Sequence, residues 1–134
     1  MRIAILVLAV LLSGCITMPR YEWFLDPHQG PMDFYRWQVV EREDMIYRCH
    51  QEPQKGRELA CVFRLNDGAI LPGDKTLDGK PAQVAAGRLC VIFATHSEDE
   101  AKQLPAFDYE GTHFDHELRH CRGWLHNWIP GRIG

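Results

Sequence analysis

Residues 112–126 read THFDHELRHCRGWLH, and the expected fold is built around this stretch. Thr112 is a good N-cap, because its side chain can accept a hydrogen bond from the first turn of a helix. Gly123 is a typical terminator, because glycine adopts the left-handed backbone conformation without steric cost. The sequence therefore predicts a helix that begins near Thr112 and ends at Gly123.

Two neighbouring faces of this predicted helix differ in chemistry. Phe114, Leu118 and Cys121 recur at steps of four and three residues and form an apolar stripe. His113, His116, Glu117 and His120 form a neighbouring polar face, on which His116 and His120, four residues apart, lie one above the other. Cys121 follows His120 by about 100° around the helix and is expected to point into the core.

The chain carries the pattern HExxHxxGxxH, which begins on this polar face and runs past the helix end, with His116, Glu117, His120, Gly123 and His126 at its fixed positions. Two histidines four apart can bind one metal ion, the glutamate can hold a water on it, and a turn at the glycine brings back a third histidine. With 7 His and 11 Gly in 134 residues, the pattern arises by chance about once in ten thousand such chains. We predict a Zn²⁺ site with the three histidines as ligands and Glu117 as general base.

The choice of third ligand depends on what else the sequence offers. Other HExxH sites use a downstream acidic residue, but no Asp or Glu follows Glu117, which leaves His126 as the conventional downstream ligand. An upstream ligand remains an alternative, and the candidates are His96, Asp108, His113 and Asp115. His28, His50 and His96 are each expected at the surface.

Four cysteines follow Cys15, and an even number in an exported chain predicts two disulfides with three possible pairings. We favour Cys49–Cys61, which would staple a hairpin, and Cys90–Cys121, which would tie a strand to the predicted helix. Zinc thiolates are the alternative, but the cysteine spacings contain no CxxC pair.

Residues 1–14 are predicted to be a lipoprotein signal peptide. A short apolar stretch, insufficient to span a bilayer, ends in Leu12-Ser13-Gly14-Cys15, which resembles the bacterial lipobox. This resemblance implies a lipid on Cys15 and location in the cell envelope, and Ile16 after it favours the outer membrane facing the periplasm. An ordinary secretory signal or an uncleaved anchor is the alternative. Residues 15–31 are expected to be a lipid-anchored tether.

Residues 32–134 suffice for one small domain, and the predicted fold class is α+β. Strands are expected at 34–40, 45–49, 59–65 and 88–95, a turn at 66–68, a loop at 72–81, and a short helix at 97–103 capped by Ser97. The sheet is expected to be antiparallel or mixed, with about four strands. A formal charge of −3 without a basic tract argues against nucleic acid as a partner.

At 116–126 the sequence resembles the metzincin zinc endopeptidases. It is also similar to small bacterial lipoproteins described as metallopeptidases, in which a cysteine-bearing strand precedes an HExxHC helix. The resemblance implies a zincin-like metallopeptidase domain over 32–134 that hydrolyses peptide bonds in envelope proteins or peptides. It also makes strand 88–95 the sheet edge along which an extended substrate lies.

Metzincins place a methionine turn beneath the zinc, but no methionine follows His126 in this chain. Either Trp124 or Trp128 is expected beneath the site instead, or the third ligand is weaker than the pattern implies. The alternative function is a catalytically inactive, zinc-stabilised envelope lipoprotein that acts as an interaction module. In a third alternative the chain is an envelope interaction protein whose function does not depend on the histidines of the pattern.

Overall fold

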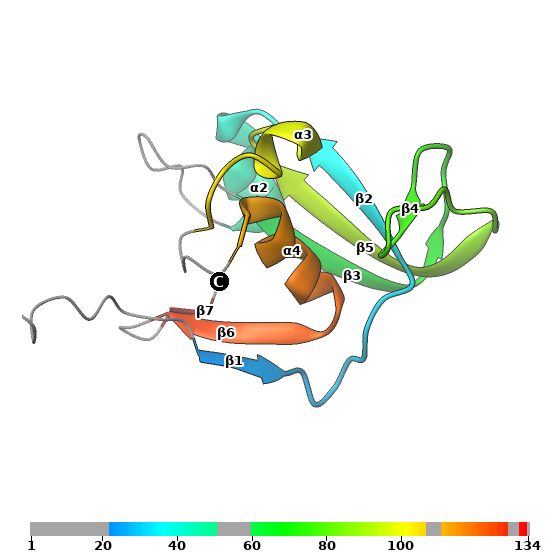
Figure 1. Ribbon diagram of the computed structural model, residues 1–134, viewed down its shortest axis with the longest axis horizontal. Coiled ribbons are helices and arrows are strands. Elements are labelled where there is room, and N and C mark those ends of the chain that lie inside the picture. Colours follow the sequence, from blue (N-terminus) through cyan, green and yellow to red (C-terminus); the bar gives the residue numbers. More distant parts are fainter. Residues whose placement is uncertain (1–21, 51–59, 107–110, 129–131, 134) are drawn as a thin grey trace, which may run out of the picture.

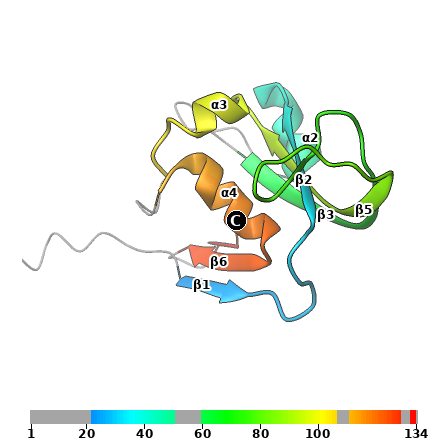
Figure 2. The same ribbon diagram turned by 45° about the vertical axis from the view of Figure 1, so that its right-hand side comes forward.

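The computed structural model describes residues 22–50, 60–106, 111–128 and 132–133, which form an α+β fold with two sheets (Figure 1). The larger sheet has the strand order β3-β5-β2-β4 and the smaller one β1-β6-β7. Helix α4 lies between them (Figure 1 and Figure 2). The strands are β1 Glu22–Leu25, β2 Phe34–Val39, β3 Ala60–Ala69, β4 Lys75–Thr76, β5 Ala86–Ala94, β6 Trp124–Trp128 and β7 Arg132–Ile133. The helices are η1 Arg42–Asp44, α2 Met45–Cys49, α3 Glu98–Ala101 and α4 His113–Cys121.

The larger sheet is mixed, as expected. Strand β5 pairs parallel to β2 and antiparallel to β3, while β4 pairs antiparallel to β2. This order corrects one expectation. The strand predicted at 88–95 is β5, and because β3 and β2 flank it on both sides, it offers no open edge to a substrate.

The predicted helix forms over His113–Cys121, and its start follows from a reciprocal capping box. The Thr112 side chain accepts a hydrogen bond from the Asp115 backbone N–H, while the Asp115 carboxylate accepts one from the Thr112 N–H at 3.0 Å. Asp115 is thus engaged at the helix start. Ser97 caps α3 in the expected way by accepting from the Glu100 N–H.

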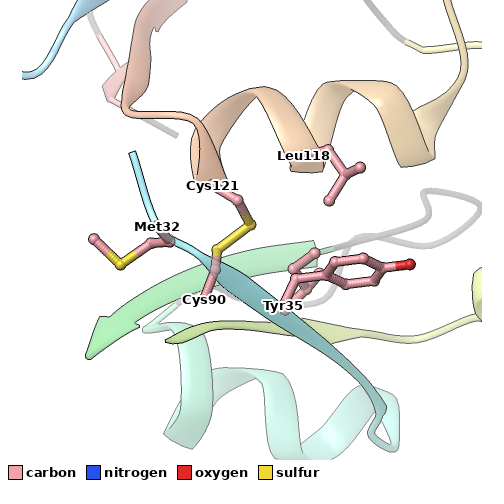
Figure 3. Packing of buried hydrophobic residues seen from close by; sticks show 6 residues of the cluster. Met32, Tyr35, Cys90, Leu118 and Cys121 are labelled. Carbon is pink, nitrogen blue, oxygen red and sulfur yellow. A yellow bond between two sulfur atoms is a disulfide. The ribbon is translucent and has the colours of Figure 1, made fainter. Parts of the chain in front are cut away.

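The apolar stripe of α4 packs on the larger sheet and forms the main core (Figure 3). Leu118 and Cys121 are buried against Tyr35 of β2 and against Cys90 and Ile92 of β5. The Cys90–Cys121 disulfide, with a Cα–Cα distance of 5.5 Å, fixes the helix to the central strand. The predicted pairing and the predicted orientation of Cys121 are both confirmed.

The Cys49–Cys61 disulfide also forms, but it joins a helix to a strand. The strand expected at 45–49 is wrong, because Met45–Cys49 is helix α2. Met45 is fully buried, and the next side chain that turns inward, Cys49, is four residues later, which is helical spacing. The polar turn expected between the two cysteines, at 51–56, lies outside the described residues.

Strand β3 continues through the turn expected at 66–68. The pairing with β5 shifts register between Leu65 and Gly68, so the Asn-Asp-Gly sequence forms a β-bulge and the strand then resumes. Gly68 is required there by close packing, since a Cβ at this position would lie 2.9 Å from the Leu89 Cβ. The turn prediction is therefore wrong.

Strand β1 lies inside the segment 15–31 that was expected to be a tether. It pairs antiparallel with β6, with Trp23 opposite His126 and Phe24 opposite Leu125. The folded part of the chain therefore begins by Glu22. Cys15 and the signal peptide predicted over 1–14 lie outside the described residues. Among the helices that are described, none has the length and apolar character needed to cross a membrane.

Candidate metal centre

The three predicted zinc ligands lie together where α4 meets β6. Each of His116, His120 and His126 offers a ring nitrogen, and these nitrogens all lie within 4.8 Å of one another. The Nε2 atoms of His116 and His126 are 3.1 Å apart. Two nitrogens bound to a tetrahedral zinc at about 2.0–2.1 Å are separated by about 3.4 Å. The separation of His116 and His126 is close to this value, and the three imidazoles are near enough to one another to share one metal ion.

Gly123 makes this convergence possible. Its φ of +95° turns the chain from the end of α4 directly into β6, where His126 is the third residue. A Cβ at this position would lie 3.3 Å from the Gly30 carbonyl carbon, so the turn also packs closely on the segment that follows β1. The Asp26 N–H donates to the Gly123 carbonyl at 2.8 Å and holds the two segments together.

A backbone hydrogen bond orients His120. Its Nδ1 lies 2.9 Å from the Trp124 carbonyl oxygen, which can only accept, so Nδ1 carries the proton and Nε2 is left to bind a metal. Burial and the neighbouring His116 lower the pKa of His120, although Glu117 opposes this. A neutral imidazole is the form that a metal requires.

Glu117 is buried on the same helix, with 4% of its surface exposed. Its Oε1 lies 3.4 Å from Nε2 of His113, one helical turn earlier. Burial alone raises the pKa of Glu117, but the hydrogen bond from His113 and the charges that His116 and His120 carry when protonated lower it to about 2. The side chain is therefore an ionised carboxylate at neutral pH, the form that accepts a proton.

The candidate upstream ligands are engaged elsewhere. Nδ1 of His113 lies 2.8 Å from Nε2 of His96, and the two rings stack at a centroid distance of 4.6 Å. His96 is buried, so its expected surface position is wrong, whereas His28 and His50 are exposed as expected. Asp108 lies outside the described residues. The sequence placed His113 and Glu117 on one helix face, but it did not indicate that His96 contacts His113.

Trp23 is the other residue that sequence reasoning missed. Its ring centroid lies 5.0 Å from that of His116, 5.2 Å from that of His120 and 4.6 Å from that of His126. The Arg119 guanidinium carbon lies 4.6 Å from the Trp23 centroid. Trp124, one of the two tryptophans expected beneath the site, contributes its backbone carbonyl, and the Trp128 side chain lies outside the described part. No local signal pointed to Trp23, because its place depends on a strand pairing across about a hundred residues.

Comparison with known protein families, with curated proteins and with solved structures finds no match for this chain.

Proposed function

We propose that this chain is a zinc-dependent peptidase in which His116, His120 and His126 hold the metal and Glu117 is the general base. One observation carries the proposal: three converging imidazoles share a helix end with a buried, ionised carboxylate. Three neutral nitrogen ligands are the protein set of catalytic zinc sites, whereas structural sites are closed by a fourth protein ligand.

Zinc held there would polarise the scissile carbonyl and lower the pKa of a water molecule. The residues of the chain supply the proton transfers. Glu117 accepts a proton from the attacking water and returns it to the departing amine. His113 steadies this carboxylate through Oε1, and the second carboxylate oxygen would hold the water.

The positions around α4 support this assignment. Viewed down the axis of α4, where each residue advances by about 100°, Glu117 lies about 60° past His120. Arg119 lies about 60° past His116, on the opposite flank of the pair formed by His116 and His120. Arg119 stacks on Trp23, so protein side chains fill the Arg119 flank. The flank of Glu117 is the one on which water and a substrate carbonyl would meet the carboxylate.

The proposal is tested by comparing the parent with Glu117→Gln, which keeps the shape of the side chain and removes the base. Both proteins should bind zinc in equal proportion, but only the parent should cleave peptides from a broad library. Glu43→Gln, in exposed η1, is the matched control and should cleave like the parent. If Glu117→Gln yields the same products at the same rate as the parent, Glu117 is not the base and the peptidase proposal fails.

The second candidate is a catalytically inactive, zinc-stabilised envelope lipoprotein that acts as an interaction module. The observation that favours it is enclosure: His120 is 6% exposed and His126 3%. If this candidate is right, the zinc-loaded parent should cleave no library peptide that the metal-free protein leaves intact.

We also propose that a lipid on Cys15 anchors the protein in the bacterial envelope, with the outer membrane as the site. Labelled palmitate should enter the full-length chain expressed in a Gram-negative host and not Cys15→Ala, and the labelled protein should fractionate with the outer membrane. Labelling of Cys15→Ala at the parental level would contradict the anchor.

A further inference from the structure

We infer that Trp23 is the floor of the metal site, a positioning residue that holds the three imidazoles from the side opposite Glu117. This inference rests on the proposed metal site, and it does not require that the site be catalytic. Trp23 has no metal-binding atom, since the indole N–H is a donor only. Its role must therefore act through the histidines that it contacts.

The four rings are arranged almost regularly. The His116–His120, His116–His126 and His120–His126 centroid distances are 5.2, 4.9 and 4.8 Å. Trp23 is 4.6–5.2 Å from each of the same rings. It therefore lies on the axis of the triad, equally close to all three ligands. Two positions on that axis are compatible with these distances: beneath the ion, or over its fourth coordination position.

The neighbours of Trp23 decide between these positions. Arg119 stacks on it, and Arg119 is on the flank of α4 opposite Glu117. Trp23 is also the direct cross-strand partner of His126, so the two side chains rise from the same face of the β1–β6 pair. Trp23 thus lies on the side away from Glu117, which places it beneath the ion.

Trp23 in this position restricts the rotation of the imidazole rings that it contacts. Trp23 meets His116 and His126 at interplanar angles of 67° and 78°, so imidazoles that turn away from the shared point lose edge-to-face contact or collide with the indole. The indole N–H is buried and has no hydrogen-bond acceptor among the described residues. The aromatic ring of Trp23 therefore makes the contacts with the histidines, and its indole N–H is dispensable.

The test is the zinc affinity of the full-length chain, measured by chelator competition, together with the visible absorption of the Co²⁺-loaded protein. Phenylalanine keeps an aromatic ring and removes the N–H, so Trp23→Phe should bind zinc within about threefold of the parent. Trp23→Leu should bind roughly 10- to 100-fold more weakly, the usual loss when a group that orients metal ligands is removed. Phe24→Ala is the control, since Phe24 is the next residue of β1, points to the opposite face and is 39% exposed. It should bind as the parent does.

The Co²⁺ spectrum distinguishes a floor from a cover over the fourth position. With Trp23 beneath the ion, acetohydroxamate should perturb the spectrum of the parent and of Trp23→Phe alike. If Trp23→Leu binds zinc as tightly as the parent, or if acetohydroxamate perturbs only Trp23→Leu, Trp23 is not the floor. A parent that binds no zinc would instead overturn the proposed metal site itself, so the two failures are distinct. Trp23→Phe keeps the comparison informative if Trp23→Leu does not fold.

Discussion

At Gly123 a single backbone conformation connects the helix to His126, the proposed third ligand. The residue has a φ of +95°, and its carbonyl is tied to Asp26 while its α-carbon packs against the Gln29–Pro31 backbone. A side chain at this position would be strained by its φ and crowded by neighbouring backbone. The position of His126 therefore depends on a residue that binds no metal.

We expect Gly123→Ala to lower the free energy of unfolding by about 1–3 kcal/mol, the range for a strained backbone conformation, and to weaken zinc binding as well. Gly73→Ala is the matched control, because Gly73 has the same φ of +95° and open space around it. Denaturant unfolding should show a loss in both variants, and chelator competition should show weaker zinc binding in Gly123→Ala alone. Equal zinc affinity for the two variants would show that His126 is positioned without Gly123.

Asp74 is the second residue that links distant segments. Two oxygens of its buried carboxylate accept hydrogen bonds from Nε and Nη2 of Arg36 on β2, both at 2.8 Å, and one of them also accepts from the Leu71 N–H. Burial raises the pKa of Asp74, but Arg36 and the Leu71 N–H outweigh it and lower the pKa below its ordinary value. The ionised form therefore stabilises the loop between β3 and β4.

This arrangement predicts a pH dependence with a definite sign. Because the folded state lowers the pKa, the stabilisation is complete above the unfolded value of about 3.9 and is lost as the pH falls below it. Asp74→Asn should be less stable than the parent at pH 7 by about 1–2 kcal/mol, a discounted value since Arg36 is partly exposed. The difference should shrink below pH 4 in urea unfolding. Exposed Asp33→Asn should show no such change, and a constant difference for Asp74→Asn would exclude the ion pair as its cause.

The elements differ in how far local sequence determines them. Helix α4 was predicted to within two residues at each end, because its cap, its apolar stripe and its terminating glycine are all local signals. The four residues of β1 carry no such signal, and β1 is a strand because β6 pairs with it. A strand was predicted where helix α2 forms, because five residues are too few to distinguish the helical period of about 3.6 residues from the strand period of about 2. The triad could be predicted from residues 116–126, and Trp23 could not, because it arrives on β1.

The two disulfides should contribute unequally to stability. Cys90 and Cys121 are 31 residues apart, fully buried, and join α4 to the central strand, whereas Cys49 and Cys61 are 12 apart. The chain-entropy model gives about 3.7 kcal/mol for the longer loop and about 2.8 kcal/mol for the shorter one. Replacing Cys90 and Cys121 by Ala also leaves a cavity in the core, which increases its cost.

We therefore expect the Cys90→Ala, Cys121→Ala double variant to lose more stability than the Cys49→Ala, Cys61→Ala double variant, by at least about 1 kcal/mol. Thermal unfolding measures this difference in stability between the two double variants. The parent is unfolded alongside them under oxidising and under reducing conditions. Reduction of the parent should lower its Tm below that of either variant kept oxidised. A larger loss from the Cys49–Cys61 pair would mean that the core does not depend on the bond from α4 to β5.

At the scale of the whole molecule, the larger sheet and the smaller sheet are held to α4 by different means. The larger sheet has a disulfide and the main apolar core. The smaller sheet meets α4 largely through the histidine triad and Trp23, and the exposed side chain of Phe24 shows that the other face of β1 is not buried by the described residues. A bound metal would therefore stabilise mainly the attachment of β1 and β6.

Removing zinc should accordingly loosen one part of the molecule before the rest. At free zinc about a thousandfold above Kd, binding stabilises the native state by about 4 kcal/mol, so a chelator should lower the Tm by roughly 10–20 °C for a domain of this size. Hydrogen exchange should then accelerate in peptides covering 22–25 and 124–128, whereas the 86–94 segment keeps its protection, because the core and the disulfide hold β5 without the metal. His126→Ala should abolish the Tm response to zinc and exposed His28→Ala should retain it. Uniform acceleration across all three segments would show that the ion stabilises one cooperative unit and not the attachment of the smaller sheet.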